Sequence, residues 1–196
     1  MGSASTTTAA SVSVVRYDIL EHRHRFAAWA ASRAASVKGC RFSVEQGKAI
    51  LERAGQRALI ACPQELPAPN PSSVDRAHEA WREAVIDAAR DFRLTFTHGI
   101  AAKLINIYLK AAFVCGGHED HERVHHLHPP VDGLLLDSLH RSAAGGEVLV
   151  DLWAAMAAKR WSKFDAKDYQ SVIDAVRRVV GCAPLWTIEA LWRGYQ

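Results

Sequence analysis

The sequence predicts an all-α protein that folds as a single compact multi-helix domain. Apolar residues recur at helical spacing along most of the chain, and helix-capping or helix-ending residues stand at the ends of these segments. No set of alternating apolar and polar residues predicts a sheet. The chain has 196 residues, 49% of them hydrophobic, which suits one domain with a substantial core.

The first helices are expected after a leader. Residues 1–15 are rich in Ser, Thr and Ala and are expected to be disordered, while residues 16–196 form the helical domain. A capping box of Ser43 and Gln46 predicts a helix that ends at Gly55. Before it, a helix over residues 16–36 should bury an apolar stripe made of Ile19, Leu20, Phe26, Trp29, Ala30 and Ala34.

Proline and glycine divide the rest of the chain. Four prolines in residues 62–71 exclude a helix and predict an extended surface segment. Ser72 or Ser73 then caps a helix that runs to about Arg93, and residues 116–128 form a polar loop. The other expected helices span residues 100–114, 131 to the Gly145-Gly146 break, 148–158, 165–181 and 184 onwards.

Composition bounds the function classes. The net charge of +3 and the ten histidines permit nucleic-acid binding without proving it. The four cysteines form no Cys-x-x-Cys pair, which argues against a zinc ribbon, an iron–sulfur cluster or a disulfide scaffold. No apolar run reaches membrane-spanning length, and the start lacks the pattern of a signal peptide. We therefore expect a cytoplasmic monomer without cofactor or metal.

Two helix starts carry the candidate chemistry. Lys103 lies in the first turn of the helix over residues 100–114, and Asn106 and Lys110 share its stripe, which should form a basic-polar face. Free backbone N–H groups near Gly99 could bind a phosphate. Asp132 begins the next apolar helix, either as a helix cap or as a carboxylate that points into a cleft. The local pattern leaves solvated lysines and a simple cap open as alternatives.

These residues resemble a known pattern. Residues 99–107, Gly-Ile-Ala-Ala-Lys-Leu-Ile-Asn-Ile, resemble the second half of the helix-hairpin-helix in DNA glycosylases of the helix-hairpin-helix-GPD superfamily. Residues 131–135, Val-Asp-Gly-Leu-Leu, are similar to the segment that carries the catalytic aspartate of that family. Residues 36–40 lie where the family has a turn that fills the gap left by an extruded base. Ala101 replaces the second hairpin glycine, and the absence of cluster cysteines excludes the iron–sulfur branch.

The resemblance implies a function and a set of site residues. It implies that double-stranded DNA is bound, that a damaged or modified nucleotide is flipped out, and that the base is excised in repair or phage defence. Lys103 would attack the sugar C1′ and form a Schiff base, with possible lyase chemistry, while Asp132 would stabilise the transition state or, alternatively, activate water. The residues expected to bind DNA are Lys38, Arg41, His98, Gly99, Ala101 and Lys110, and those expected to line the base pocket are His128, Trp161 and Tyr169.

Two other functions stay open from the sequence. A helical protein could use the basic helix to bind nucleic acid without catalysis. A metal-dependent hydrolase could use the histidine-rich segment 118–128, in which His121 and His125 have i, i+4 spacing. That segment contains no complete metallohydrolase motif, and a solvated polar loop is the simpler explanation of its composition.

Overall fold

The computed structural model describes residues 17–194, and the expected leader over residues 1–15 lies outside them. The all-α class is confirmed, because within residues 17–194 the backbone forms helices and only one isolated bridge, between Val37 and Cys40. The α-helices are α1 (Ile19–Ala35), α2 (Val44–Arg53), α3 (Gln56–Leu59), α4 (Pro71–Arg90), α5 (His98–Leu109), α6 (Glu122–His125), α7 (Gly133–Arg141), α8 (Glu147–Lys159) and α9 (Ala166–Val180).

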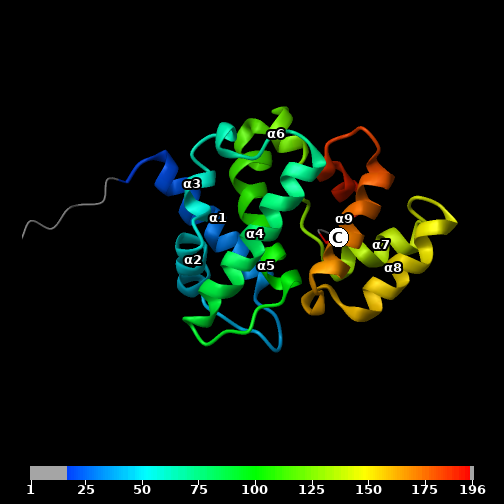
Figure 1. Ribbon diagram of the computed structural model, residues 1–196, viewed down its shortest axis with the longest axis horizontal. Coiled ribbons are helices and arrows are strands. Elements are labelled where there is room, and N and C mark those ends of the chain that lie inside the picture. Colours follow the sequence, from blue (N-terminus) through cyan, green and yellow to red (C-terminus); the bar gives the residue numbers. More distant parts are fainter. Residues whose placement is uncertain (1–16, 195–196) are drawn as a thin grey trace, which may run out of the picture.

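The helices enclose two hydrophobic cores. The first core lies among α1, α2, α4 and α5, and the second lies among α7, α8, α9 and the 3₁₀ segment η4 (Leu185–Leu191). Figure 1 shows α1 to α6 on one side of the molecule and α7 to α9 on the other. Most of the buried side chains of α5 belong to the first core, but Ala102 packs in the second. Helix α5 therefore lies at the boundary between the two halves.

Local capping signals are largely confirmed. The Ser43–Gln46 capping box starts α2, and Asp165 forms a second capping box at the start of α9. Helix α4 begins slightly earlier than expected because Asn70, and not Ser72 or Ser73, accepts the N–H of Ser73. Residues 62–71 contain no α-helix before Pro71, only the short 3₁₀ turn η1 (Pro63–Glu65). The segment after Pro184 is 3₁₀-helical.

The buried face of α1 differs from the expected one. Phe26 and Trp29 are more than half exposed, and Ile19 is 72% exposed. The buried face consists instead of small and polar residues, namely Glu21, His24, Ala27, Ala28, Ala31, Ser32 and Ala35. Small side chains let α1 pack closely along α5, its main partner. The expected apolar stripe is therefore wrong for Ile19, Phe26 and Trp29, whereas Leu20 does pack against the first core.

The helix that begins at His98 is longer than expected. It continues into the π-helical segment η2 (Lys110–His118), which is kinked at Gly117, where φ is +80°. The expected polar loop follows η2 and contains the short helix α6. By length and composition, residues 98–118 could cross a membrane, which differs from the sequence expectation. However, 67% of the most apolar window is buried inside the protein, as in the core helix of a soluble protein.

Candidate active site

Lys103 and Asp132 form a direct pair. The Nζ atom of Lys103 lies 3.0 Å from Oδ2 of Asp132 and donates a hydrogen bond to it. The lysine side chain is 6% exposed and the aspartate side chain is 20% exposed, so the pair is largely shielded and the carboxylate keeps some access to solvent. The two residues come from different halves of the molecule, because Lys103 lies on α5 and Asp132 precedes α7.

Asp132 serves as a helix cap and as the lysine's partner at once. Its Oδ1 accepts the backbone N–H of Leu135 at 2.9 Å, which fixes the carboxylate at the start of α7. Its Oδ2 accepts both Lys103 Nζ and, at 3.1 Å, the indole N–H of Trp192. The two interpretations of Asp132 that the sequence left open are therefore compatible: one oxygen holds the helix and the other faces the lysine.

The environment of Lys103 lowers its pKa below the ordinary lysine value. Burial lowers the pKa of the Lys103 ammonium, and the charge and hydrogen bond of Asp132 oppose this shift without cancelling it. The Nζ atom also lies 5.7 Å from the ring centroid of Trp161, within the range of a cation–π contact. A lysine in such a site is a stronger nucleophile near neutral pH than one in solvent.

Gly99 places Trp161 beside the lysine. A Cβ atom on Gly99 would lie 1.8 Å from the carbonyl oxygen of Trp161, so only glycine lets the segment η3 (Trp161–Lys163) pack so tightly on α5. The N–H of Gly99 donates to the carbonyl of Phe164 at 3.1 Å. Trp161, expected in the base pocket, therefore lies against the catalytic candidate and is half-buried.

The expected phosphate site at the start of α5 is wrong. Gly99 and Ala101 are buried, and their N–H groups donate to carbonyls of this chain, those of Phe164 and Thr97. The N–H of Ile100 donates to the Thr97 hydroxyl. These donors are already satisfied, so they cannot bind a DNA phosphate while this packing persists.

The polar stripe of α5 faces the protein and not the solvent. Lys103 and Asn106 are 5% and 2% exposed. Lys110 is partly exposed and forms an ion pair with Glu189. Lys110 is therefore not a free DNA-binding cation, and the expected basic-polar surface is wrong, because the second half of the molecule covers this face of α5.

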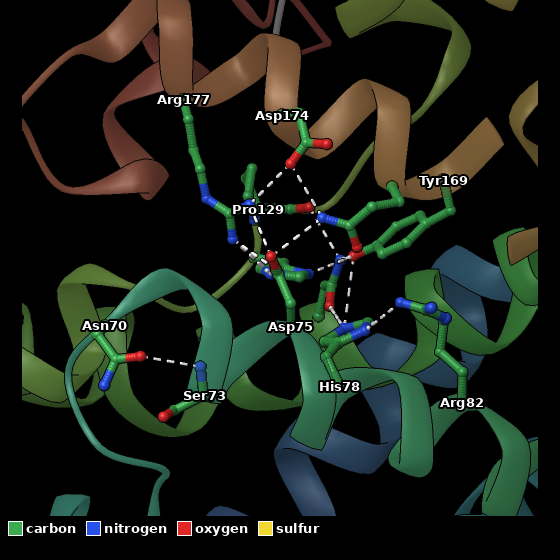
Figure 2. Close-up of polar contacts among 12 residues, drawn as sticks. Asn70, Ser73, Asp75, His78, Arg82, Pro129, Tyr169, Asp174 and Arg177 are labelled. Carbon is green, nitrogen blue, oxygen red and sulfur yellow. Dashed lines mark hydrogen bonds and ion pairs between the residues drawn. The ribbon is translucent and has the colours of Figure 1, made fainter. Parts of the chain in front are cut away.

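A buried polar network lies next to the pair (Figure 2). Asp75 binds Arg177 through both carboxylate oxygens and accepts His128 Nε2 at 2.9 Å. The other nitrogen of His128, Nδ1, lies 3.1 Å from the hydroxyl of Tyr169. The side chain of Asn106 continues the network, with its Nδ2 atom 2.9 Å from that hydroxyl.

The network extends to a buried arginine. Asn106 Oδ1 lies 2.7 Å from His78 Nε2, and His78 Nδ1 lies 2.8 Å from Arg82 Nη1. The Arg82 guanidinium also lies over the ring of Tyr169, 4.5 Å from its centroid. Arg82 is 1% exposed, so this charge is held inside the protein by an imidazole and an aromatic face.

The hydrogen bonds along the path from Arg82 to Asp75 can all point in one direction. Arg82 can only donate, so His78 accepts at Nδ1 and carries its proton at Nε2, which donates to Asn106. Asn106 then donates to Tyr169, Tyr169 to His128, and His128 to the Asp75 carboxylate, so neutral side chains connect a cation to an anion.

The titration behaviour agrees with this assignment. Burial lowers the pKa of both imidazoles, and for His78 nearby positive charge adds to the effect. Burial alone would raise the pKa of Asp75, but hydrogen bonds from His128 and Arg177 outweigh it and hold the pKa well below its usual range. Both histidines are therefore neutral near pH 7 and Asp75 is charged.

This network fastens the segment that carries Asp132. The Nδ2 atom of Asn106 also donates to the carbonyl of Pro129 at 2.9 Å, three residues before Asp132. Asn106 lies one turn after Lys103 on α5. The buried amide of Asn106 therefore connects the helix that carries Lys103 to the chain that leads to Asp132.

Two expected base-pocket residues are buried in this network. His128 and Tyr169 are 4% and 1% exposed, and their polar atoms are engaged within the protein. Their side chains stabilise the packing of the buried network and do not line an open pocket, so the expectation that they line the base pocket is wrong. Sequence reasoning missed the network residues Asp75, His78, Arg82 and Arg177, because each meets its partner only in the folded chain and carries no local signal.

The remaining expected DNA-binding residues are Lys38, Arg41 and His98. Lys38 is exposed at the tip of the tight turn closed by Val37 and Cys40, and Arg41 is exposed just after it. Cys40 Sγ contacts the carbonyl of Thr95, which places this turn near the loop before α5. His98 is half-buried, and its Nδ1 accepts a long hydrogen bond of 3.4 Å from Arg82.

The histidine-rich segment contains no metal site among residues 17–194, where no three His, Cys, Asp or Glu side chains gather closely enough to hold a metal ion. His121 caps α6 by accepting the N–H of Arg123.

A surface hollow of about 490 Å³ lies along α7 and the chain around Trp192, lined by Leu134, Ser138, Arg141, Ser142, Leu191 and Arg193.

Comparison of the chain with protein-family models, with curated proteins and with solved structures gave no match.

Proposed function

We propose that this chain is a DNA glycosylase that excises a damaged or chemically modified base, with Lys103 and Asp132 as the reacting residues. The observation that supports the proposal best is the 3.0 Å contact between Lys103 Nζ and Asp132 Oδ2 in a shielded site where burial lowers the lysine pKa. The sequence resemblance pairs the same two residues, although they lie 29 positions apart in the chain.

The proposed reaction uses the lysine as the nucleophile. Asp132 accepts a proton from the Lys103 ammonium, and the neutral amine attacks C1′ of the extruded nucleotide. The new C1′–N bond forms as the glycosidic bond breaks, and the bonding electron pair leaves with the base, which takes up a proton. The base takes up the proton that Asp132 accepted, so the carboxylate is charged again and stabilises the positive charge that develops on the sugar ring. The C1′–O4′ bond of the sugar then breaks as the C1′=N bond of the Schiff base forms, and O4′ takes up a proton and remains on C4′ as a hydroxyl.

A second candidate is a helical protein that binds nucleic acid without catalysis. The exposed cations Lys38 and Arg41 favour it, since exposed cations attract the phosphate backbone without sequence preference. A buried ion pair such as Lys103–Asp132 can also join two helices without any chemistry. The proposal of a metal-dependent hydrolase has no such supporting observation.

The decisive experiment measures base excision. The protein is incubated with duplexes that carry a panel of modified bases, and heat or alkali reveals abasic sites. Sodium borohydride would trap a covalent lysine intermediate on the cleaved substrate. We expect Lys103→Met to abolish trapping and Asp132→Asn to slow excision by about 100-fold or more. Lys110→Met, at the position that directly follows α5, should leave both unchanged.

Two outcomes separate the candidates. If the wild type and both site variants bind DNA equally and no substrate yields abasic sites, the binding protein is the correct interpretation. If excision occurs but survives Lys103→Met and is lost only with Asp132→Asn, Asp132 activates water and the enzyme releases the base without a covalent intermediate.

A further inference from the structure

The indole of Trp192 shares a carboxylate oxygen with the candidate nucleophile. Trp192 directly follows η4, and its Nε1–H donates to Asp132 Oδ2 at 3.1 Å. Lys103 Nζ donates to the same oxygen at 3.0 Å. Three elements distant in sequence therefore meet on one atom: α5, the start of α7 and the chain after η4.

We propose that Trp192 is a positioning residue for the pair, because its N–H holds Oδ2 of Asp132 and competes with Lys103 for that oxygen. The carboxylate then stabilises the ammonium less than an unshared carboxylate would. The consequence for catalysis rests on the proposed glycosylase function, whereas the effect on the lysine can be measured without any activity.

The competition between the two donors is electrostatic, because the carboxylate has enough lone pairs for both. An ionised carboxylate accepts about four hydrogen bonds. Asp132 Oδ1 accepts the helix-capping N–H of Leu135, so the orientation of the carboxylate is fixed. Oδ2 then has two donors on it, one charged and one neutral. A neutral N–H donor stabilises the anion by itself and so reduces the gain from a nearby cation.

The other groups around Lys103 do not supply this effect. Glu189 of η4 acts on the ammonium in the same direction as Asp132, and Lys110, which directly follows α5, opposes them. Trp161 of η3 presents a ring face that favours the cation. The indole of Trp192 is neutral at every working pH, and its N–H acts on the lysine through the shared oxygen.

The chain offers a matched control. Trp186 lies in η4, shortly before Trp192, and its buried Nε1 has no hydrogen-bond partner among the described residues. Trp186→Phe therefore removes an indole N–H without breaking a hydrogen bond, while Trp192→Phe removes the one on Asp132. Both substitutions keep an aromatic ring in place.

The test is an NMR titration of the full chain with ¹³C-labelled lysine, in which the Cε resonance of Lys103 is assigned by its loss in Lys103→Met. We expect the pKa of Lys103 to rise by about half a unit or more in Trp192→Phe and to stay unchanged in Trp186→Phe. An unchanged or lower pKa in folded Trp192→Phe overturns the inference, and so does an equal rise in both variants.

A second measurement applies if Trp192→Phe does not fold. The indole Nε1–H resonance of Trp192, assigned in the ¹⁵N-labelled wild type, should move upfield in Asp132→Asn, because the charged acceptor is lost. The Trp186 resonance should stay in place. A Trp192 resonance that does not respond contradicts the hydrogen bond and the inference with it.

The outcomes distinguish this inference from the proposed function. If the lysine pKa rises as expected but no DNA substrate is cleaved, Trp192 tunes Lys103 and the glycosylase proposal fails. If the wild type cleaves DNA, the alkaline shift in Trp192→Phe should also appear in the pH profile of borohydride trapping. Cleavage with an unshifted pH profile would overturn the positioning role alone.

Discussion

Replacement of Asp132 by Asn should separate the charge of this residue from its role as a helix cap. An Asn oxygen can accept the N–H of Leu135 as Asp132 Oδ1 does, so the start of α7 keeps its cap at little cost. The change therefore removes mainly the negative charge opposite Lys103, which is 5% exposed. The buried ammonium must then stay charged without a carboxylate or give up its proton.

The cost of removing the proton from Lys103 sets an upper limit to the loss of stability in Asp132→Asn. Lysine has an ordinary pKa of 10.5, and each pH unit below that value costs about 1.36 kcal/mol to deprotonate it. At pH 7.5 the limit is about 4 kcal/mol, which agrees with the roughly 3–5 kcal/mol typical of a broken buried pair. We therefore expect Asp132→Asn to lower the free energy of unfolding by about 3–4 kcal/mol at pH 7.5.

The pH dependence provides the sharper test. The pKa of Lys103 is lower in the folded protein than the ordinary lysine value of 10.5. Between these two pKa values the unfolded chain binds a proton that the folded protein has lost, so the free energy of unfolding rises with pH over that range. The deficit of Asp132→Asn relative to the wild type should shrink by up to about 1.36 kcal/mol per unit from pH 7 towards pH 9, since the carboxylate no longer opposes the shift.

Urea unfolding at pH 7, 8 and 9 measures this deficit. Glu189→Gln is the matched control, because its partner Lys110 is 30% exposed and can be solvated when the charge is lost. The control should lose less than about 1 kcal/mol at every pH. A deficit for Asp132→Asn that stays constant across this range, or remains as small as that of the control, would refute the reasoning.

Three further substitutions test the packing and the network around the pair. Gly99→Ala should displace Trp161, whose carbonyl oxygen would lie 1.8 Å from the new Cβ atom, and reduce the thermal stability and any borohydride trapping together; unchanged trapping contradicts this. In urea unfolding, His78→Gln should lose about 1.4 kcal/mol less stability than the wild type between pH 7 and 5.5. The reason is that the folded protein does not protonate His78, whereas the unfolded histidine binds a proton below about pH 6.5. His140→Gln, at an exposed site, should not reduce this loss. Asn106→Leu should cost about 2–4 kcal/mol by leaving buried polar groups unpaired; a loss below about 1 kcal/mol would show that the network rearranges.

The helix ends follow from local chemistry, which explains how well the sequence predicts them. The capping box of Ser43 and Gln46 and the cap at Asp165 are satisfied by groups within three residues. The cap at Asp132 belongs to the same class. These residues bind backbone donors that any helix start leaves free, so their role needs no distant partner.

The buried faces depend on distant partners, and periodicity alone misleads there. Helix α1 carries an aromatic stripe and an alanine stripe, and the alanine stripe is the one buried on α5. Within the same face Glu21 is bound by Arg25 and Arg57, and His24 by Tyr108, from 84 residues away. A polar residue on a helix is predicted as exposed unless its partner is known, and no local pattern reveals that partner.

The same reason explains what could be predicted of the candidate site. Lys103 and Asp132 were identified because their short flanking segments resemble a family pattern, and the structure places them in contact. Trp192 lies 60 residues from Asp132 in sequence, so no motif connects the two. Residues that position a reacting pair through hydrogen bonds need only reach it in space, and their spacing in the chain is unconstrained.

The position of the pair between two cores gives the buried network a clear physical role. Lys103 belongs to a helix packed mainly in the first core, and Asp132 starts a helix of the second, so a shift of one half would separate Nζ from Oδ2. Asn106 opposes such a shift because it binds α4 through His78, α9 through Tyr169 and the chain before Asp132 through Pro129. Its donors and acceptors are satisfied only in one arrangement of these elements, and movement would leave buried polar groups unpaired. The geometry of the pair is thus set before any ligand binds, which is the preorganisation that electrostatic stabilisation of a developing charge requires.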